Sequence, residues 1–231
     1  MHGKYVLITG GTGGLGQAVT RYCAEAGAAI TLPYRKEEEI NRLKAEMDED
    51  LLVQLTTVRA DLLLEQDVLK VLDKMPRVDI LIHLMGGFSM EKTTDISLKD
   101  WHFQMDINLT SAFLMIRSCL GPMQEQGYGR IITIGSKAAI DAPGEMAAYV
   151  ASKAGLVAFT RSVSAEFNDQ NITANVILPA VIDTPANRSA MGDKNSHRWV
   201  TPRSLAKVIS FLVSDSASDI RGAVIPVYGK V

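Results

Sequence analysis

The chain has 231 residues, of which 47% are hydrophobic and 22% charged, and its formal net charge at pH 7 is −2. This length suits one α/β domain spanning residues 1–231, with enough apolar side chains for a sizeable core. The charge balance gives no basic surplus for a nucleic-acid partner, and no apolar run reaches the roughly 18 residues of a membrane span. The first residues lack a signal-peptide pattern, so we expect a cytoplasmic protein.

Short β-branched segments alternate with longer helical patterns along the whole chain. Strands are predicted at residues 5–9, 29–33, 52–59, 78–84, 129–134, 173–178 and 223–228. Helices are predicted at residues 14–26, 37–47, 65–75, 98–126, 149–168 and 205–213, the fourth being one long helix or two abutting ones. This alternation predicts a doubly wound, Rossmann-type α/β fold, with a seven-stranded parallel sheet and helices on both faces.

The longest stretch without a predicted element runs from Pro179 to Pro202. It is too long for an ordinary connection between a strand and a helix, and loops of such length are commonly lids or binding loops. We therefore expect this stretch to lie near the substrate cleft.

A glycine-rich turn connects the first strand to the first helix. It reads TGGTGGLG over residues 9–16, a TGxxxGxG spacing. Glycines let the backbone approach a ligand closely, and the free N–H groups of the helix start attract a pyrophosphate. The turn thus predicts a dinucleotide site, although a connection that needs glycine only for packing is the alternative. The cofactor contacts predicted here are Gly10, Thr12, Gly13, Gly14, Leu15 and Gly16.

Two later positions bear on the identity of the nucleotide. Asp61 ends the third strand and can accept a hydrogen bond from an adenine amino group, with Leu62 beside it as a further contact; a helix N-cap is an equal alternative for Asp61. In NAD-binding proteins an acidic residue usually follows the second strand, where Arg35 stands here. A guanidinium suits a 2′-phosphate, so the sequence favours NADP(H) over NAD(H), the alternative being a surface arginine unconnected with a cofactor.

Three residues form the candidate catalytic set. Ser136 ends the fifth predicted strand, Tyr149 follows 13 residues later, and Lys153 lies four residues further along the same helix. Residues at i and i+4 share a helix face, so we expect the ammonium to lie near the phenol and to lower its pKa from about 10. Such a phenol can exchange a proton with a carbonyl or alcohol oxygen that Ser136 holds by a hydrogen bond.

These motifs together resemble the short-chain dehydrogenase/reductases over essentially the whole chain. The resemblance implies that Tyr149 and Lys153 also contact the cofactor, and that Asn108 holds a water in a proton relay through the cofactor ribose. Without the family, Asn108 is equally explained as a polar residue that fixes a helix kink. The resemblance adds four cofactor contacts, namely Gly86, Pro179, Ile182 and Thr184.

One motif departs from the family pattern. The Asn-Asn-Ala-Gly run that usually follows the fourth strand appears here as HLMG over residues 83–86. The two side-chain amides that brace the central sheet and the cofactor are therefore absent. We interpret His83 as a buried histidine with satisfied hydrogen bonds, the alternative being partial substitution for asparagine.

A second, local likeness concerns the substrate. Residues 86–88, 135–141 and 182–191 are similar to quinonoid dihydropteridine reductases, which reduce a quinonoid pterin with NADH. Those enzymes lack a serine before the tyrosine and carry an acidic residue after the second strand, unlike this chain with Ser136 and Arg35. Donors and a stacking surface are expected to meet the substrate, a solvated loop being an equal alternative; the candidates are Phe88, Asn187, Arg188 and Trp199.

The sequence therefore predicts an NAD(P)H-dependent oxidoreductase that interconverts a carbonyl and an alcohol on a small substrate. The alternatives are reduction of a quinonoid pterin and a catalytically silent nucleotide sensor. By resemblance, a homo-oligomer (dimer or tetramer) forms through the helices that start near Leu98 and Tyr149. Cys23 and Cys119 are predicted core residues, and no metal site is expected.

Overall fold

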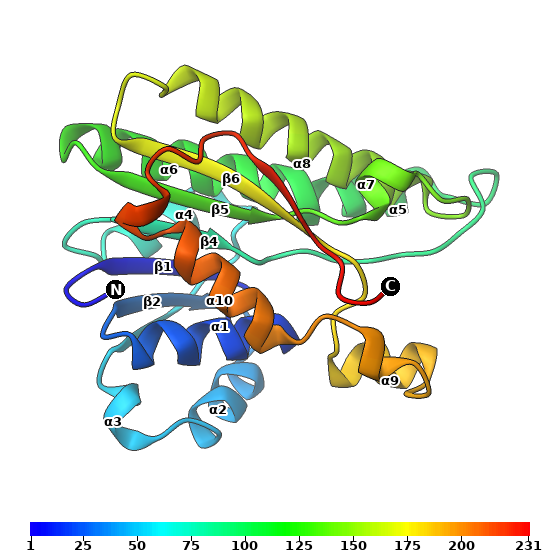
Figure 1. The fold of residues 1–231 in the computed structure, drawn as a ribbon, viewed down its shortest axis with the longest axis horizontal. Coiled ribbons are helices and arrows are strands. Elements are labelled where there is room, and N and C mark those ends of the chain that lie inside the picture. The colour runs from blue at the N-terminus through cyan, green and yellow to red at the C-terminus, as the bar shows by residue number, and fades with distance from the viewer.

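The computed structural model describes residues 1–231 and contains one seven-stranded parallel sheet (Figure 1). The strand order is β3-β2-β1-β4-β5-β6-β7, so the chain winds outward from β1 in one direction and then from β4 in the other. The strands are β1 (Tyr5–Thr9), β2 (Ala29–Tyr34), β3 (Leu55–Arg59), β4 (Ile80–His83), β5 (Gly129–Ile134), β6 (Ile172–Pro179) and β7 (Val224–Val227). The topological switch point therefore lies between β1 and β4, where doubly wound folds bind their ligands.

Helices cover both faces of the sheet, as Figure 1 shows with α1 and α10 on one side and α6 and α8 on the other. One apolar core contains Val19 of α1 and Ile209 of α10, and the second contains Met115 of α6 and Val163 of α8. The helices are α1 (Gly14–Glu25), α2 (Glu37–Ala45), α3 (Glu49–Leu52), α4 (Glu65–Leu72), α5 (Leu98–Met105), α6 (Ser111–Glu125), α7 (Ala138–Asp141), α8 (Ala147–Glu166), α9 (Pro185–Met191) and α10 (Pro202–Leu212). The predicted fold class is confirmed.

Several predicted boundaries need correction. Residues 52–54 are not part of the third strand, because the short helix α3 precedes it and β3 begins at Leu55. Of the two alternatives for residues 98–126, the structure has the two abutting helices, α5 and α6, joined by a π-helical turn, Asp106–Thr110. The stretch Pro179–Pro202 is not structureless, since Thr184 caps α9 by accepting a hydrogen bond from the Asn187 N–H.

The two cysteines lie in the two cores as predicted, Cys23 in α1 and Cys119 in α6. Burial raises the pKa of each thiol to about 12, so both remain protonated at neutral pH. None of the helices combines the length and the apolar character that crossing a membrane would demand.

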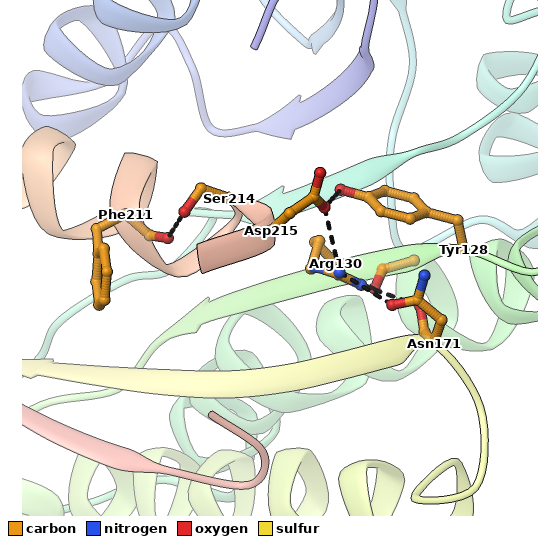
Figure 2. Close-up of polar contacts among 7 residues, drawn as sticks. Tyr128, Arg130, Asn171, Phe211, Ser214 and Asp215 are labelled. Carbon is orange, nitrogen blue, oxygen red and sulfur yellow. Dashed lines mark hydrogen bonds and ion pairs between the residues drawn. The ribbon is translucent and has the colours of Figure 1, made fainter. Parts of the chain in front are cut away.

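A buried arginine ties the strands together at the amino edge of the sheet, opposite the switch point. Figure 2 shows Arg130, at the start of β5, between the Asn171 side chain and the Asp215 carboxylate. Its Nη2 donates to Asn171 Oδ1 at 3.0 Å and lies 3.5 Å from Asp215, while the guanidinium stacks 4.3 Å from the Tyr128 ring. Because Arg130 is only 1% exposed, these contacts are needed to compensate a buried charge, and we assign the cluster to stability.

Candidate active site

A cavity of about 550 Å³ opens at the carboxyl edge of the sheet. Ser136 follows β5, and Tyr149 and Lys153 lie on one face of α8; all three side chains line this cavity. Leu15 comes from the end of the glycine turn and Gly86 from the segment after β4, so residues remote in sequence meet at one place. The structure thus brings together the serine, tyrosine and lysine that the spacing predicted.

The Tyr149 phenol is largely buried, and its protonation differs from the sequence-based expectation. Burial raises the pKa of Tyr149, while a hydrogen bond to the Ser136 side chain lowers it to a smaller extent. The expectation that the Tyr149 pKa is lowered is therefore wrong for this structure, because burial has the largest effect on it. The phenol is neutral at physiological pH and is available as a proton donor.

Lys153 points into the interior and is 5% exposed. Its Nζ donates a hydrogen bond to the Ile134 carbonyl oxygen at 2.8 Å, which holds the ammonium against the end of β5. Burial lowers the pKa of Lys153 to about 8, so the amine is charged at neutral pH but close to titrating. A methyl group at Gly86 would lie 3.1 Å from this Nζ, which shows how closely the backbone after β4 passes the lysine.

Asn108 lies within the π-helical turn, a feature often found at functional sites. Its Oδ1 accepts from the Gly87 N–H at 3.0 Å and its Nδ2 donates to the Gly87 carbonyl at 3.0 Å. The same Nδ2 lies 3.1 Å from Gln104 Oε1 and from Ser152 Oγ. The Asn108 amide therefore holds Gly87, in the segment after β4, against α8. This structural role resembles the alternative interpretation, in which Asn108 fixes a helix kink.

His83 is fully buried between two hydroxyl groups, as we interpreted it from the sequence. Its Nδ1 lies 2.9 Å from Thr9 Oγ1, and its Nε2 lies 3.3 Å from Ser111 Oγ. Ser111 uses its own proton to donate to the Ile107 carbonyl at 2.8 Å, so Ser111 Oγ accepts from the imidazole. The network therefore assigns the proton to Nε2 and makes Nδ1 the acceptor from Thr9, linking β1 and β4 to the π-helical turn.

We predict that replacing His83 by leucine lowers the free energy of unfolding by about 2 kcal/mol, because the buried Thr9 and Ser111 hydroxyls each lose a partner. His83→Asn keeps one amide for these hydroxyls and should lose less. Urea denaturation of the three proteins measures the difference; equal stability of the leucine and wild-type proteins would contradict the network.

The same variants carry a pH signature. Burial, followed by the Lys153 charge, lowers the pKa of His83 from 6.5 to about 3. At a pH between these two pKa values, His83 is protonated in the unfolded chain and neutral in the folded chain. The free energy of unfolding therefore falls as the pH drops from about 6.5 towards 3. The stability advantage of wild type over His83→Asn should shrink across that window, whereas a constant difference would exclude a neutral buried imidazole.

The glycine turn has the shape that a dinucleotide requires. Gly10 has a φ of +67°, and a methyl group on it would lie 2.8 Å from the Met85 backbone nitrogen after β4. A methyl group on Gly16 would lie 2.0 Å from the Gly10 carbonyl oxygen. Gly13 is the N-cap of α1 and makes no side-chain hydrogen bond. No capping side chain therefore occupies the first N–H groups of this helix, which can bind a phosphate. These residues fit a nicotinamide dinucleotide.

A second, smaller cavity of about 300 Å³ lies at the ends of β2 and β3. Arg35 and Asp61, two of the predicted cofactor contacts, line it together with Arg59 and Lys70, which the sequence analysis did not single out. The Asp61 carboxylate accepts from the Leu63 N–H at 3.1 Å in a local turn, and the N-cap of α4 is Leu64, so Asp61 is not the helix N-cap of the alternative interpretation. Leu62 packs into the second core, so its side chain does not line the cavity.

The four predicted substrate contacts separate into two pairs. Phe88 and Asn187 line the large cavity, and the Phe88 ring meets the Tyr149 ring edge-on with centroids 5.1 Å apart. Arg188 does not line it, because its guanidinium is paired with the Asp183 carboxylate at 2.6 Å. Trp199 does not line it either, since the indole is 8% exposed and packs away from the cavity.

Other cavity-lining residues were missed. The structure adds Lys137, Asp141, Met146 and Met191. Lys137, Asp141 and Met191 lie in the segments similar to quinonoid dihydropteridine reductases, and Lys137 and Asp141 also form an i, i+4 charge pair. Among the remaining predicted cofactor contacts, Leu15, Pro179 and Ile182 line the large cavity. Thr184 lies beside Gly14, whose added methyl group would come within 2.8 Å of Thr184 Cγ2.

Comparisons with known proteins agree with this geometry. The family model described as short chain dehydrogenase matches residues 4–195. The 3-oxoacyl-[acyl-carrier-protein] reductase of Rickettsia felis is 32% identical, over 98% of this chain and 96% of its own length. An NAD-dependent glycerol dehydrogenase of Listeria innocua is 30% identical, over 95% and 90% respectively. The crystal structure of levodione reductase superposes with a TM-score of 0.89 at 27% identity, covering 99% of this chain and 97% of that one.

Proposed function

Because the chain belongs to the short-chain dehydrogenase family and is an NAD(P)-dependent oxidoreductase, we propose that it reduces the carbonyl group of a small molecule to an alcohol, with Tyr149 as general acid. The observation that carries the proposal is the convergence of Tyr149, Ser136 and Lys153 in one cavity that also reaches the glycine turn. A neutral Tyr149 phenol is the form that can donate a proton to a carbonyl oxygen.

The protein side of the reaction follows from the side chains. When bound, the nicotinamide supplies the hydride to the carbonyl carbon. Tyr149 gives its proton to the carbonyl oxygen, and the Ser136 hydroxyl donates a hydrogen bond to the same oxygen as negative charge develops on it. The Lys153 ammonium favours the phenolate that remains, and Asn108 keeps the segment after β4 in place beside Lys153. We also propose that Asn108 holds a water in the proton relay that includes Tyr149 and Lys153.

We propose NADP(H) as the preferred cofactor because Arg35 lines the cavity at the end of β2 and no carboxylate closes that strand. Replacement of Arg35 by glutamate should weaken NADPH binding at least about tenfold, through loss of a charge-assisted hydrogen bond, and leave NADH binding unchanged or tighter. Fluorescence titration with both nucleotides measures this. Arg203→Glu, the same charge change at an exposed position of α10, is the control; a wild-type preference for NADH would refute the assignment.

The two other candidate functions have different standing. A catalytically silent nucleotide sensor is set aside, because the family comparison assigns an oxidoreductase. Reduction of a quinonoid pterin remains the rival substrate proposal, supported by the local likeness of residues 135–141 and 182–191. Turnover of a ketone panel and of a quinonoid pterin, measured side by side, separates the two reactions.

We also propose that the protein forms a homo-oligomer through α5 and α8, the helices that start near Leu98 and Tyr149, with α6 beside α8. Leu98 and Phe103 of α5 are 71% and 53% exposed, and Phe113 of α6 is 41% exposed. Large apolar side chains gathered on neighbouring helices are typical of an interface between subunits. Sedimentation velocity should give a mass of two or four chains, and Phe113→Asp should shift it towards one; a monomeric wild-type protein would contradict the proposal.

A further inference from the structure

The cavity wall beyond the proposed catalytic groups is mostly apolar. Phe88 covers one side of Tyr149, and side chains from three further segments complete the wall. These are Pro143, Met146, Val181 and Met191. Apolar side chains gain nothing from contact with an ion, but each gains free energy when a hydrocarbon group displaces water from it.

The charged side chains of the cavity are already engaged within the protein. Lys137 Nζ lies 3.6 Å from the Asp141 carboxylate, and the same ammonium lies 5.3 Å from the centre of the Tyr228 ring. Lys153 donates to the Ile134 carbonyl. An anionic substrate group would therefore have to compete with Asp141 for Lys137, or lie against the buried Lys153.

The mouth of the cavity exposes unusually large apolar side chains. Phe88 is 60% exposed and Met191, the last residue of α9, is 62% exposed, yet both line the cavity. Large apolar side chains that lie both in a cavity and at the surface indicate a ligand whose apolar part leaves the cavity at that point.

The polar amide at this end points inward. Asn187 Nδ2 donates to the Ile182 carbonyl at 2.8 Å, so its two amide protons are not both free for a substrate. A planar ring with several donors and acceptors would leave polar groups facing methionine and phenylalanine.

We propose that the substrate is an uncharged ketone with an apolar body, its carbonyl at Tyr149 and its hydrocarbon part running past Met146 to the mouth between Phe88 and Met191. This inference rests on the proposed carbonyl reduction and adds the class of substrate. It excludes carboxylates and phosphorylated ketones as good substrates.

The first test compares matched ketones at saturating NADPH. A 3-oxo acid ethyl ester and the corresponding free 3-oxo carboxylate share the same reacting carbonyl and differ in charge. The ester should have a kcat/KM at least about tenfold higher, because the carboxylate loses hydration without gaining a free cation. Along a series of esters with longer acyl chains, kcat/KM should rise by up to about fourfold per methylene group, from the free energy of burying each CH₂.

The second test changes the mouth. Met191→Ser should flatten the chain-length dependence while the shortest ester keeps its rate, because the short chain ends before Met191. Met90→Ser is the matched control, since Met90 is 58% exposed and does not line the cavity. The NADPH dissociation constant should stay unchanged in both variants.

The outcomes distinguish a failure of the proposed substrate class from a failure of the proposed carbonyl reduction. A carboxylate reduced as well as its ester, or a chain-length series without a slope, would overturn the apolar substrate class while leaving carbonyl reduction standing. A slope that survives Met191→Ser would overturn the placement of the hydrocarbon at the mouth. If neither esters nor simple ketones are reduced, the proposed function itself fails.

Discussion

Replacing Tyr149 by phenylalanine is expected to lower kcat for ketone reduction by about a thousandfold, the middle of the range for loss of a general acid. The variant keeps the ring, so the edge-to-face contact with Phe88 and the wall of the cavity remain. Only the hydroxyl that delivers the proton and the hydrogen bond with Ser136 are lost. The effect should therefore be far larger on kcat than on cofactor affinity, where only the predicted contact of the hydroxyl with the cofactor is lost.

The measurement is single-turnover oxidation of NADPH in the presence of a ketone, with NADPH binding measured separately by fluorescence. Unchanged binding with the large loss of rate places Tyr149 in the chemical step. A variant that keeps its rate within a factor of a few would show that another group, or water, supplies the proton.

The second large effect concerns the glycine turn. Gly16→Ala would place a methyl group 2.0 Å from the Gly10 carbonyl oxygen and 2.6 Å from the Gly11 backbone, contacts that only a shift of the main chain can relieve. We expect the free energy of unfolding to fall by about 3 kcal/mol, and NADPH binding to weaken at least about tenfold in whatever protein remains folded.

Gly144→Ala is the matched control for this substitution. No atom lies within 4 Å of a methyl group added at Gly144, so stability and NADPH binding should stay at the wild-type level. Urea denaturation and nucleotide titration of both variants test the prediction. Full NADPH affinity in Gly16→Ala would mean that the turn does not form the cofactor cradle.

The sheet and the meeting of the three candidate catalytic residues in one cavity were predictable because they depend on short patterns. β1 and β5 have the predicted bounds, since each contains consecutive branched apolar residues and is followed directly by a glycine, Gly10 or Gly135. Tyr149 and Lys153 share a helix face by spacing alone, and Ser136 meets them because parallel strands place their carboxyl ends at one edge. These relations need no knowledge of side-chain packing.

The parts that were not predictable depend on contacts between segments distant in sequence. Nothing local to Trp199 shows that it is buried instead of stacking on a substrate, and Arg188 is removed from the cavity by its pairing with Asp183. The pKa of Tyr149 is raised instead of lowered because burial outweighs the hydrogen bond with Ser136, and burial is a property of the assembled fold. Met191 entered the site because α9 formed within a stretch predicted to be irregular.

The central claim is that a neutral Tyr149 phenol donates the proton while Lys153 is charged, and the pH dependence of ketone reduction at saturating NADPH tests it most directly. We predict a kcat that is constant through neutral pH and falls as the pH passes about 8, where Lys153 begins to lose its proton. The Tyr149→Phe protein should show no such fall within its residual rate. A kcat that rises through neutral pH would mean that the ionised phenol is the active form, and would contradict the account.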